Sequence, residues 1–320
     1  MADLTKLAGF DLIQEHYKFV GDHGIRADIL VPQTNYSGPR PTIARFHGGG
    51  LAIADSLYMD WFPYWLSDLA LEQEAVIISA NYRLLPRSTS PEIYSDLQDF
   101  YKWLRSPSLE EVLASHSNPT ELDLGHLLVT GESAGGLLSI QSALSHPHDI
   151  KASIAMYPMV DLKSPDFTEP RSIPPFGVHS EESLVAELLS TLPDEPYSST
   201  SAEYLPLMLA AFEYGHVGDW YSQGVNETCH TVGLYPLQHI ERKGQQIPKG
   251  GFTIIQGLND TVVPAHHAVP FVKRAREIFK GSQIQYITRE GEHGFDGNLR
   301  LKENGWLQRA LGPVVEAWLN

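Results

Sequence analysis

The sequence predicts an α/β fold in which a mostly parallel sheet is covered by helices on both faces and carries an inserted helical cap. Short apolar, β-branched runs alternate with helical segments over most of the 320 residues, an order typical of parallel sheets. One such run ends in the turn Gly131-Glu132-Ser133-Ala134-Gly135, directly before a helical segment. The alternation stops over residues 164–248, where prolines, aromatics and apolar helical stretches replace it.

The composition favours a small neutral or apolar ligand. With 23 basic and 39 acidic residues the formal net charge is −16, which opposes binding to nucleic acid or to anionic membrane surfaces. No apolar run approaches the length of about 18 residues that a membrane span needs. Cys229 is the only cysteine, which excludes an internal disulfide and a thiolate metal cluster. The chain starts without a basic segment followed by an apolar one, so we expect a cytoplasmic protein without stable membrane anchoring.

The first third of the chain carries the signals of four strands and two helices. Residues 14–20 and 25–31 alternate on either side of the glycine-containing turn at 21–24, which predicts an antiparallel hairpin. Continuous apolar character predicts strands buried on both faces at 42–46 and 75–80, and helical spacing of apolar residues predicts helices at 61–71 and 92–104. We assign residues 1–19 to a short N-terminal part of the cap and residues 20–163 to the core.

The rest of the chain continues this pattern on both sides of the insert. The apolar run at 127–129 leads into the Ser133 turn, residues 137–141 predict a helix, and residues 152–157 predict a sixth strand. Inside the cap, residues 164–248, we expect one helical face over 184–192 and a helix at 204–212 that is apolar nearly all round. The core resumes over 249–320, with strands expected at 251–256 and 284–288 and helices at 266–279 and 306–318.

Ser133 is the candidate nucleophile because of its place in the sharp turn. Gly131 and Gly135 flank it at the spacing of a G-x-S-x-G turn, in which side chains at the two glycine positions would collide with the backbone. The hydroxyl would then be exposed at the carboxyl edge of the sheet. A glycine-rich turn without chemistry is the alternative interpretation. Since an alcohol is a poor nucleophile near neutral pH, catalysis also requires a base and a group that orients this base.

His293 is the candidate base, because it directly follows the last predicted strand, and reactive groups collect at the carboxyl ends of parallel strands. Asp260 follows the strand at 251–256 and is the candidate acid, while Asp161, after the sixth strand, is its rival. The non-catalytic alternatives are a loop histidine that caps a turn and an Asx turn that opens a helix. Helix-end or solvent-facing roles are expected for His146, His148, His266 and His267.

The glycine loop His47-Gly48-Gly49-Gly50 follows the strand at 42–46 with little side chain to cover its backbone. We expect the N–H groups of Gly48 and Gly49, with that of Ala134 at the start of a helix, to stabilise the oxyanion of a tetrahedral intermediate. A flexible turn is the alternative. The serine, the histidine, the aspartate and the glycine loop together predict a serine hydrolase.

These motifs resemble the hormone-sensitive-lipase-like branch of the α/β-hydrolase superfamily, which joins an HGGG loop, a Tyr-Arg-Leu-x-Pro stretch, here residues 82–86, and a G-x-S-A-G-G elbow in this order. The resemblance covers about residues 42–295. It implies an α/β-hydrolase fold with an eight-stranded sheet whose second strand is antiparallel, carboxylesterase chemistry on acyl esters, and neither a metal nor an organic cofactor. It also implies that His47 and Arg83 order their loops rather than react. The sequence departs from the family pattern at Leu85 and Arg87, and at Glu132, where aspartate is common.

The expected function is hydrolysis of a carboxylic ester of a small to medium apolar or aromatic substrate through an acyl-enzyme. A lactonase, a thioesterase, a natural-product deacetylase or an acyltransferase would use the same residues, and a non-catalytic ligand-binding receptor is the alternative from another class. The residues leave a homodimer open. Aromatic side chains expected near the substrate, with ordinary cap packing as the alternative, are Tyr58, Trp61, Phe212 and Trp220, and also Phe167, Phe176, Tyr204 and Tyr221.

Overall fold

The computed structural model describes residues 4–225 and 233–320, so Cys229 and the first three residues lie outside the described residues. The strands are β1 (Phe10–Val20), β2 (His23–Pro32), β3 (Arg40–Phe46), β4 (Val76–Ala80), β5 (Leu122–Glu132), β6 (Ile150–Met156), β7 (Phe252–Gly257) and β8 (Ile284–Arg289). The α-helices are α1 (Tyr64–Glu72), α2 (Ser90–Trp103), α3 (Pro107–Ser115), α4 (Ala134–Ser145), α5 (Pro165–Thr168), α6 (Ser183–Leu189), α7 (Leu205–Glu213), α8 (His216–Ser222), α9 (Pro236–Ile240), α10 (Val269–Ile278) and α11 (Gly305–Leu319). Short 3-10 helices are η1 (Leu4–Leu7), η2 (Pro175–Gly177), η3 (Ala202–Tyr204), η5 (Ala265–Ala268) and η6 (Leu301–Glu303).

The strands of the described residues form one eight-stranded sheet in the order β1-β2-β4-β3-β5-β6-β7-β8. Strand β2 runs antiparallel to its neighbours β1 and β4, and the remaining neighbours pair in parallel. This topology confirms the expected fold class, an α/β-hydrolase sheet whose second strand is antiparallel. All parallel strands therefore end at the same edge, where the candidate site residues were expected.

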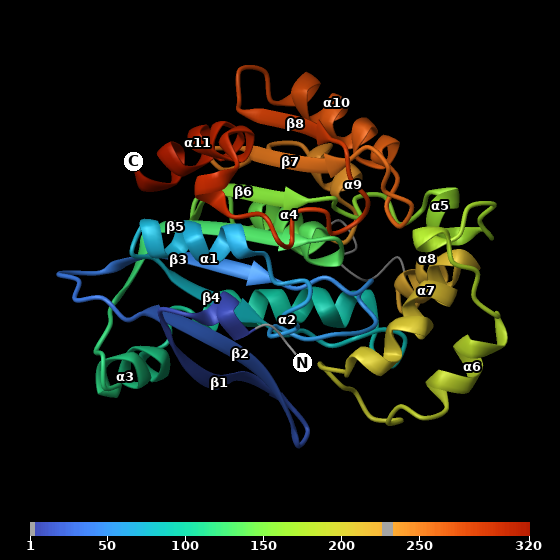
Figure 1. Ribbon diagram of the computed structural model, residues 1–320, viewed down its shortest axis with the longest axis horizontal. Coiled ribbons are helices and arrows are strands. Elements are labelled where there is room, and N and C mark those ends of the chain that lie inside the picture. The colour runs from blue at the N-terminus through green and yellow to red at the C-terminus, as the bar shows by residue number, and fades with distance from the viewer. Residues whose placement is uncertain (1–3, 226–232) are drawn as a thin grey trace.

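The two faces of the sheet belong to two separate apolar clusters. In β4, Val76 and Ile78 lie in one cluster and Ile77 lies in the other. Helices α1 and α11 pack on the face of Ile77, whereas α2, α4 and α10 cover the opposite face (Figure 1). Because both faces are covered, every residue of β4 is buried, which explains its continuous apolar sequence.

Helices α5, α6, α7 and α8 lie beyond the carboxyl ends of the strands, on the right of Figure 1. Helix α7 is the segment predicted to be apolar nearly all round, and its residues 207, 208 and 210–213 are buried. A Cβ atom on Gly50 would lie 2.6 Å from the Phe212 ring, so α7 packs directly on the glycine loop after β3. The helices over the sheet edge and the loop beneath them thus form one packed unit.

The structure differs from the sequence-based expectation in three places. The expected hairpin strand at 14–20 is confirmed, but β1 begins already at Phe10, so residues 10–19, which the domain boundaries place in the cap, lie in an edge strand that pairs with β2. Helix α3 was not predicted, because only Leu109 and Leu113 of it are buried. Residues 236–240 fall in the segment 164–248 that we assigned to the cap, but they form helix α9, which packs against the core helices α4 and α10. Among the described residues, no helix combines the length and the apolar character needed to cross a bilayer.

Candidate active site

Ser133 lies at the junction of β5 and α4 in a left-handed backbone conformation, with φ 56° and ψ −114°. Its N–H donates to the Met156 carbonyl at 2.9 Å, which ties the turn to the end of β6. A Cβ atom added to Gly135 would lie 1.9 Å from the Phe46 carbonyl oxygen. A Cβ atom added to Gly131 would lie 2.2 Å from the Gly135 carbonyl oxygen. The predicted need for glycine on both sides of the serine is therefore confirmed.

His293 and Asp260 form a hydrogen-bonded pair, with the imidazole Nδ1 2.8 Å from the carboxylate Oδ2. The Asp260 side chain is fully buried, and its Oδ1 accepts the N–H groups of Val262 at 2.9 Å and Val263 at 2.7 Å. These bonds fix the carboxylate, so that it holds the imidazole with Nδ1 protonated and Nε2 free to accept a proton.

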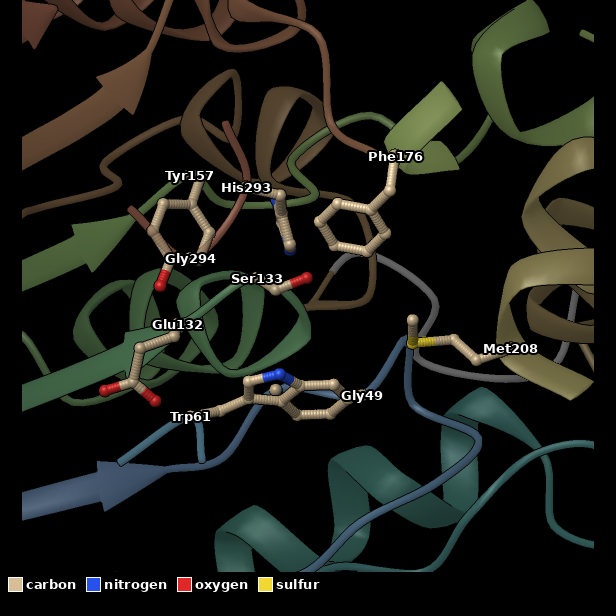
Figure 2. A pocket seen from close by; sticks show the side chains of 10 residues that line it. Gly49, Trp61, Glu132, Ser133, Tyr157, Phe176, Met208, His293 and Gly294 are labelled. Atoms are coloured by element: carbon tan, nitrogen blue, oxygen red, sulfur yellow. The ribbon is translucent and has the colours of Figure 1, made fainter. Parts of the chain in front are cut away.

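The structure brings Ser133, His293 and Asp260 together at the carboxyl edge of the sheet. Ser133 and His293 line the same pocket, and Figure 2 shows the imidazole and the hydroxyl group side by side above it. Asp260 comes from the loop after β7 and His293 from the loop after β8. Residues far apart in the chain therefore meet because the strands that carry them, β5, β7 and β8, run in parallel and end at the same edge of the sheet.

The rival acid and the other histidines have different partners. Asp161 accepts the N–H of Lys163 at 3.3 Å, and its own N–H donates to Nε2 of the buried His267 at 3.0 Å. His266 is exposed and lies 3.0 Å from Asp166. His146 follows the end of α4 and His148 is exposed, as the sequence suggested. Asp260 is thus the carboxylate that holds the candidate base.

The glycine loop after β3 lies against the serine turn. A Cβ atom on Gly48 would lie 3.1 Å from the Glu132 carbonyl oxygen, and Gly49 lines the pocket with φ 108°, a backbone conformation that favours glycine. No hydrogen bond among the described residues uses the N–H of Gly48, Gly49 or Ala134. These three groups are therefore available to a ligand oxygen in the pocket.

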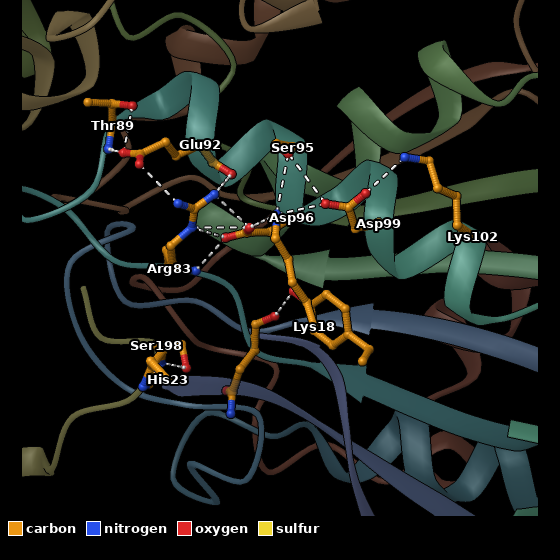
Figure 3. Close-up of polar contacts among 12 residues, drawn as sticks. Lys18, His23, Arg83, Thr89, Glu92, Ser95, Asp96, Asp99, Lys102 and Ser198 are labelled. Carbon is orange, nitrogen blue, oxygen red and sulfur yellow. Dashed lines mark hydrogen bonds and ion pairs between the residues drawn. The ribbon is translucent and has the colours of Figure 1, made fainter. Parts of the chain in front are cut away.

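His47 and Arg83 hold loops in place. His47 is buried, its Nδ1–H donates to the Gly48 carbonyl at 2.7 Å, and its ring stacks on Tyr82 with a centroid distance of 4.4 Å. Burial lowers the pKa of His47 to about 4, so the ring is neutral. Arg83 binds Asp96 through its guanidinium at 2.9 Å and through its backbone N–H at 3.0 Å (Figure 3). These contacts position the backbone on which the glycine loop lies.

Glu132, which departs from the family pattern, forms a buried ion pair with Arg45 of β3. The Arg45 guanidinium donates to both carboxylate oxygens, at 3.2 Å and 2.9 Å, and lies 4.3 Å from the centre of the Phe62 ring. Burial raises the pKa of Glu132 to about 7, although Arg45 opposes this shift. The longer side chain of glutamate thus joins the residue before the nucleophile to the neighbouring strand.

The pocket beside Ser133 and His293 encloses about 380 Å³ of space, including its open mouth. Trp61 and Phe176 are the two expected aromatic residues that line it. Tyr58 packs on Trp61 at a ring distance of 4.5 Å, outside the pocket. The remaining expected aromatics lie within the cap or its contacts: Phe167 and Phe212 are buried against each other, Trp220 and Tyr221 are buried, and Tyr204 is half-buried.

Tyr157 and Met208 also line the pocket, although the sequence analysis did not single them out. The ring of Tyr157 lies 4.5 Å from that of His293, and its hydroxyl donates to the buried Asp296 at 2.7 Å. Burial raises the pKa values of both Tyr157 and Asp296. Tyr157 directly follows β6, so the strand-end rule that selected Asp260 and His293 applies to it as well. Met208 comes from α7, and no sequence pattern relates that helix to the pocket.

Comparisons with known proteins agree with this fold. Residues 43–196 match a family model described as the alpha/beta hydrolase fold. The chain is 28% identical over 326 residues to a probable carboxylesterase M8 from Phoma sp., an alignment that covers 98% of each chain. It is 26% identical over 221 residues to an arylacetamide deacetylase from Bos taurus, covering 65% of this chain and 53% of the relative.

Solved structures share the same fold. A hyperthermophilic esterase from Pyrobaculum calidifontis superimposes with a TM-score of 0.61, covering 98% of this chain and 87% of the esterase, at 19% sequence identity. At this level of identity the likeness is one of fold. The sheet and the helices that cover it therefore follow an arrangement that other chains share.

Proposed function

Since the chain belongs to the α/β-hydrolase superfamily, on its hormone-sensitive-lipase-like carboxylesterase branch, we propose that it hydrolyses carboxylic esters through an acyl-enzyme formed on Ser133. One observation carries this proposal. The Asp260–His293 pair, at 2.8 Å, shares a pocket with a serine on a strained turn, beside backbone N–H groups that have no protein acceptor among the described residues.

The first half of the proposed reaction is acylation. His293 Nε2 accepts the proton of the Ser133 hydroxyl as its oxygen attacks the ester carbonyl. The N–H groups of Gly48, Gly49 and Ala134 stabilise the negative oxygen that forms, where each such donor lowers the barrier by roughly 3 kcal/mol. The imidazolium then protonates the departing alcohol. Asp260 orients His293 throughout and stabilises its positive charge.

The second half is deacylation. A water molecule replaces the alcohol, His293 Nε2 accepts one of its protons, and the resulting hydroxide attacks the acyl carbonyl. Collapse of the second tetrahedral intermediate returns the proton to Ser133 and releases the acid. The cycle is redox-neutral, and the polar groups that it needs come from the pocket, from the start of α4 and from the buried carboxylate of Asp260.

The proposed substrate is a neutral ester with apolar or aromatic groups. Trp61, Tyr157, Phe176 and Met208 present mainly apolar surface to the pocket, which favours such groups over charged ones. The net charge of −16 supports a neutral small molecule rather than nucleic acid or an anionic membrane surface. Cytoplasmic location, absence of stable membrane anchoring and self-association stay predictions.

The test is the variant Ser133→Ala, assayed with 4-nitrophenyl butyrate. Loss of the nucleophile should lower kcat by roughly 10⁴-fold or more. A fluorophosphonate probe should label the wild type with one equivalent and leave the variant unlabelled. The matched control is Ser222→Ala, because Ser222 is exposed and its hydroxyl donates only to the Asp219 carbonyl of its own helix. Full hydrolysis by Ser133→Ala would refute the proposal, and tight ligand binding by an unlabelled wild type would favour a receptor.

Acyl transfer to an alcohol is the second candidate activity, because the same acyl-enzyme serves it. Competition between water and added alcohols, followed as the ratio of acid to new ester, separates hydrolysis from transfer. Free acid as the main product at moderate alcohol concentration supports a hydrolase. Lactones, thioesters and acetylated natural products, offered as substrates, test the three remaining chemistries.

A further inference from the structure

Residues 173–178, here called the rim loop, form an exposed apolar edge beside the pocket. The side chains of Ile173 and Val178 are 63% and 58% exposed, and that of Phe176 is 40% exposed. Phe176 is nevertheless the residue of this loop that lines the pocket, with its ring 6.4 Å from the His293 ring (Figure 2). The position of the rim loop therefore decides how much apolar surface lies next to the catalytic imidazole.

The backbone of Phe176 is strained and needs support. Its φ of 56° and ψ of 17° are left-handed, a conformation that is unfavourable for a residue with a Cβ atom. Its N–H donates to the Thr261 hydroxyl oxygen at 2.7 Å. Thr261 directly follows Asp260, so this bond joins the rim loop to the loop of the catalytic acid.

Thr261 is in turn joined to the loop of the catalytic base through Glu292. The Thr261 hydroxyl donates to one carboxylate oxygen of Glu292 at 2.9 Å. The other carboxylate oxygen accepts the N–H of Thr261 at 2.6 Å and the N–H of His293 at 2.8 Å. One carboxylate and one hydroxyl group thus link the backbones of Phe176, Thr261 and His293.

We propose that Thr261 and Glu292 are positioning residues that fix the position of the rim loop relative to the Asp260–His293 pair. Phe176 then covers the pocket and selects esters with large apolar or aromatic groups. The inference rests on the proposed esterase activity and specifies its substrate class. Small esters do not reach Phe176, so its position does not change the rate of their hydrolysis. Larger esters bury apolar surface against the ring, and a shift of about 1 Å in such a contact can cost 10- to 100-fold in rate.

A second anchor keeps the rim loop folded when the Thr261 hydroxyl is removed. The Arg171 guanidinium donates to the carbonyl oxygens of Thr261 at 3.1 Å and Val262 at 2.7 Å, and neither bond uses the Thr261 side chain. Thr261→Val therefore removes the hydrogen bond to the Phe176 N–H and the hydroxyl bond to Glu292, while the Thr261 N–H still donates to Glu292 and the segment stays attached. Thr261→Ser keeps the hydroxyl and is the matched control.

The experiment compares wild type, Thr261→Val, Thr261→Ser, Phe176→Ala and the Thr261→Val/Phe176→Ala double variant on two substrates. Ethyl acetate is small on both sides of the ester, and 4-nitrophenyl phenylacetate is aromatic on both sides. For Thr261→Val, kcat/KM should fall about tenfold on the aromatic ester, mainly through KM, and less than about threefold on ethyl acetate. Thr261→Ser should retain wild-type selectivity. In the Phe176→Ala background, Thr261→Val should add little.

Four outcomes would overturn the inference. Equal losses on both esters would indicate a general structural role for Thr261, and additive losses in the double variant would show that Thr261 does not act through Phe176. An unchanged Thr261→Val enzyme, next to an active wild type, would also refute the link while leaving the esterase proposal intact. A wild type inactive on both esters would refute the proposed function and, with it, this inference.

Discussion

Ser133 shows how single residues are forced into a reactive geometry. Its left-handed backbone is unfavourable for serine, yet the fold leaves no alternative, because the two flanking glycines lie against the Phe46 and Gly135 carbonyl oxygens. The carboxylate of Asp260 is constrained in the same way by two backbone N–H groups. At both positions the backbone and its hydrogen bonds set the direction of the reactive side chain before any substrate arrives.

The first prediction concerns the choice between the two candidate acids. Asp260→Asn should lower kcat by about 10³- to 10⁴-fold, because an amide no longer holds the imidazole with Nδ1 protonated. Asp161→Asn is the matched control, since Asp161 also follows a strand but hydrogen-bonds Lys163 and His267 instead. It should stay within about threefold of the wild type. Steady-state kinetics on 4-nitrophenyl butyrate measure both, and the reverse ranking would contradict the assignment.

At the residue scale the sequence predicted which candidate catalytic residues lie together better than it predicted which residues line the pocket. Ser133, Asp260 and His293 follow strands, and the carboxyl ends of parallel strands lie at one edge, so chain order and strand position were sufficient to select them. Phe212 and Trp220 were selected for aromatic character alone. Aromatic character does not distinguish a residue that lines the pocket from one that packs inside the cap. The position of Phe176 depends on a left-handed backbone and on a bond to Thr261, neither of which leaves a periodic signal.

At the scale of elements, β3 and β5 are joined beneath the nucleophile by the Arg45–Glu132 pair. Both side chains are almost completely buried, and Arg45 also donates to the Ser56 carbonyl and the Ser79 hydroxyl, each at 3.0 Å. Parallel strands are already connected by their backbone ladder. The ion pair adds a side-chain link at the point where β5 turns into the Ser133 elbow.

The second prediction follows from this burial. Arg45→Met should lower the free energy of unfolding by about 3–5 kcal/mol at pH 8, because it leaves the Glu132 carboxylate buried and unpaired. The loss should be smaller at pH 6. Burial already raises the pKa of Glu132 to about 7, and removal of Arg45 raises it further, so the folded variant takes up a proton that the unfolded chain does not hold. Stability therefore falls as the pH rises through this window, more steeply in the variant than in the wild type.

Urea unfolding at both pH values measures this effect. The control is Arg300→Met, which removes an exposed pair with Asp68 and should cost less than about 1 kcal/mol. The double variant Arg45→Met/Glu132→Leu should be more stable than Arg45→Met at pH 8, because no unpaired charge stays buried. An Arg45→Met loss that does not depend on pH would contradict the argument.

The elements that the sequence identified best are those buried on both sides. Strand β4 is buried along its whole length and helix α7 over most of it, and both are apolar apart from Ser79 and Glu213, so their composition alone marks them. Strand β1 and helix α3 lie at the periphery, where few of their side chains are buried. An alternating or mostly polar sequence is therefore sufficient for them. The alternation at 14–20 predicted most of β1, but the domain boundary at residue 20 was wrong, because an edge strand is held mainly by backbone hydrogen bonds to one neighbour and little in its sequence ties it to the core.

For the whole molecule, the excess of 39 acidic over 23 basic residues sets the field through which a substrate approaches. A net charge of −16 repels anionic esters at distances below the Debye length, which shrinks from about 20 Å at low salt to about 6 Å at high salt. We therefore expect kcat/KM for 3-carboxy-4-nitrophenyl butyrate to rise about three- to tenfold between about 20 mM and about 300 mM NaCl. The neutral 4-nitrophenyl butyrate shares its acyl group and ring, and its kcat/KM should change less than about twofold, because a neutral molecule is not steered. Stopped-flow or steady-state assays at matched pH measure both, and an equal salt response of the two esters would show that salt acts on the enzyme itself rather than on the encounter.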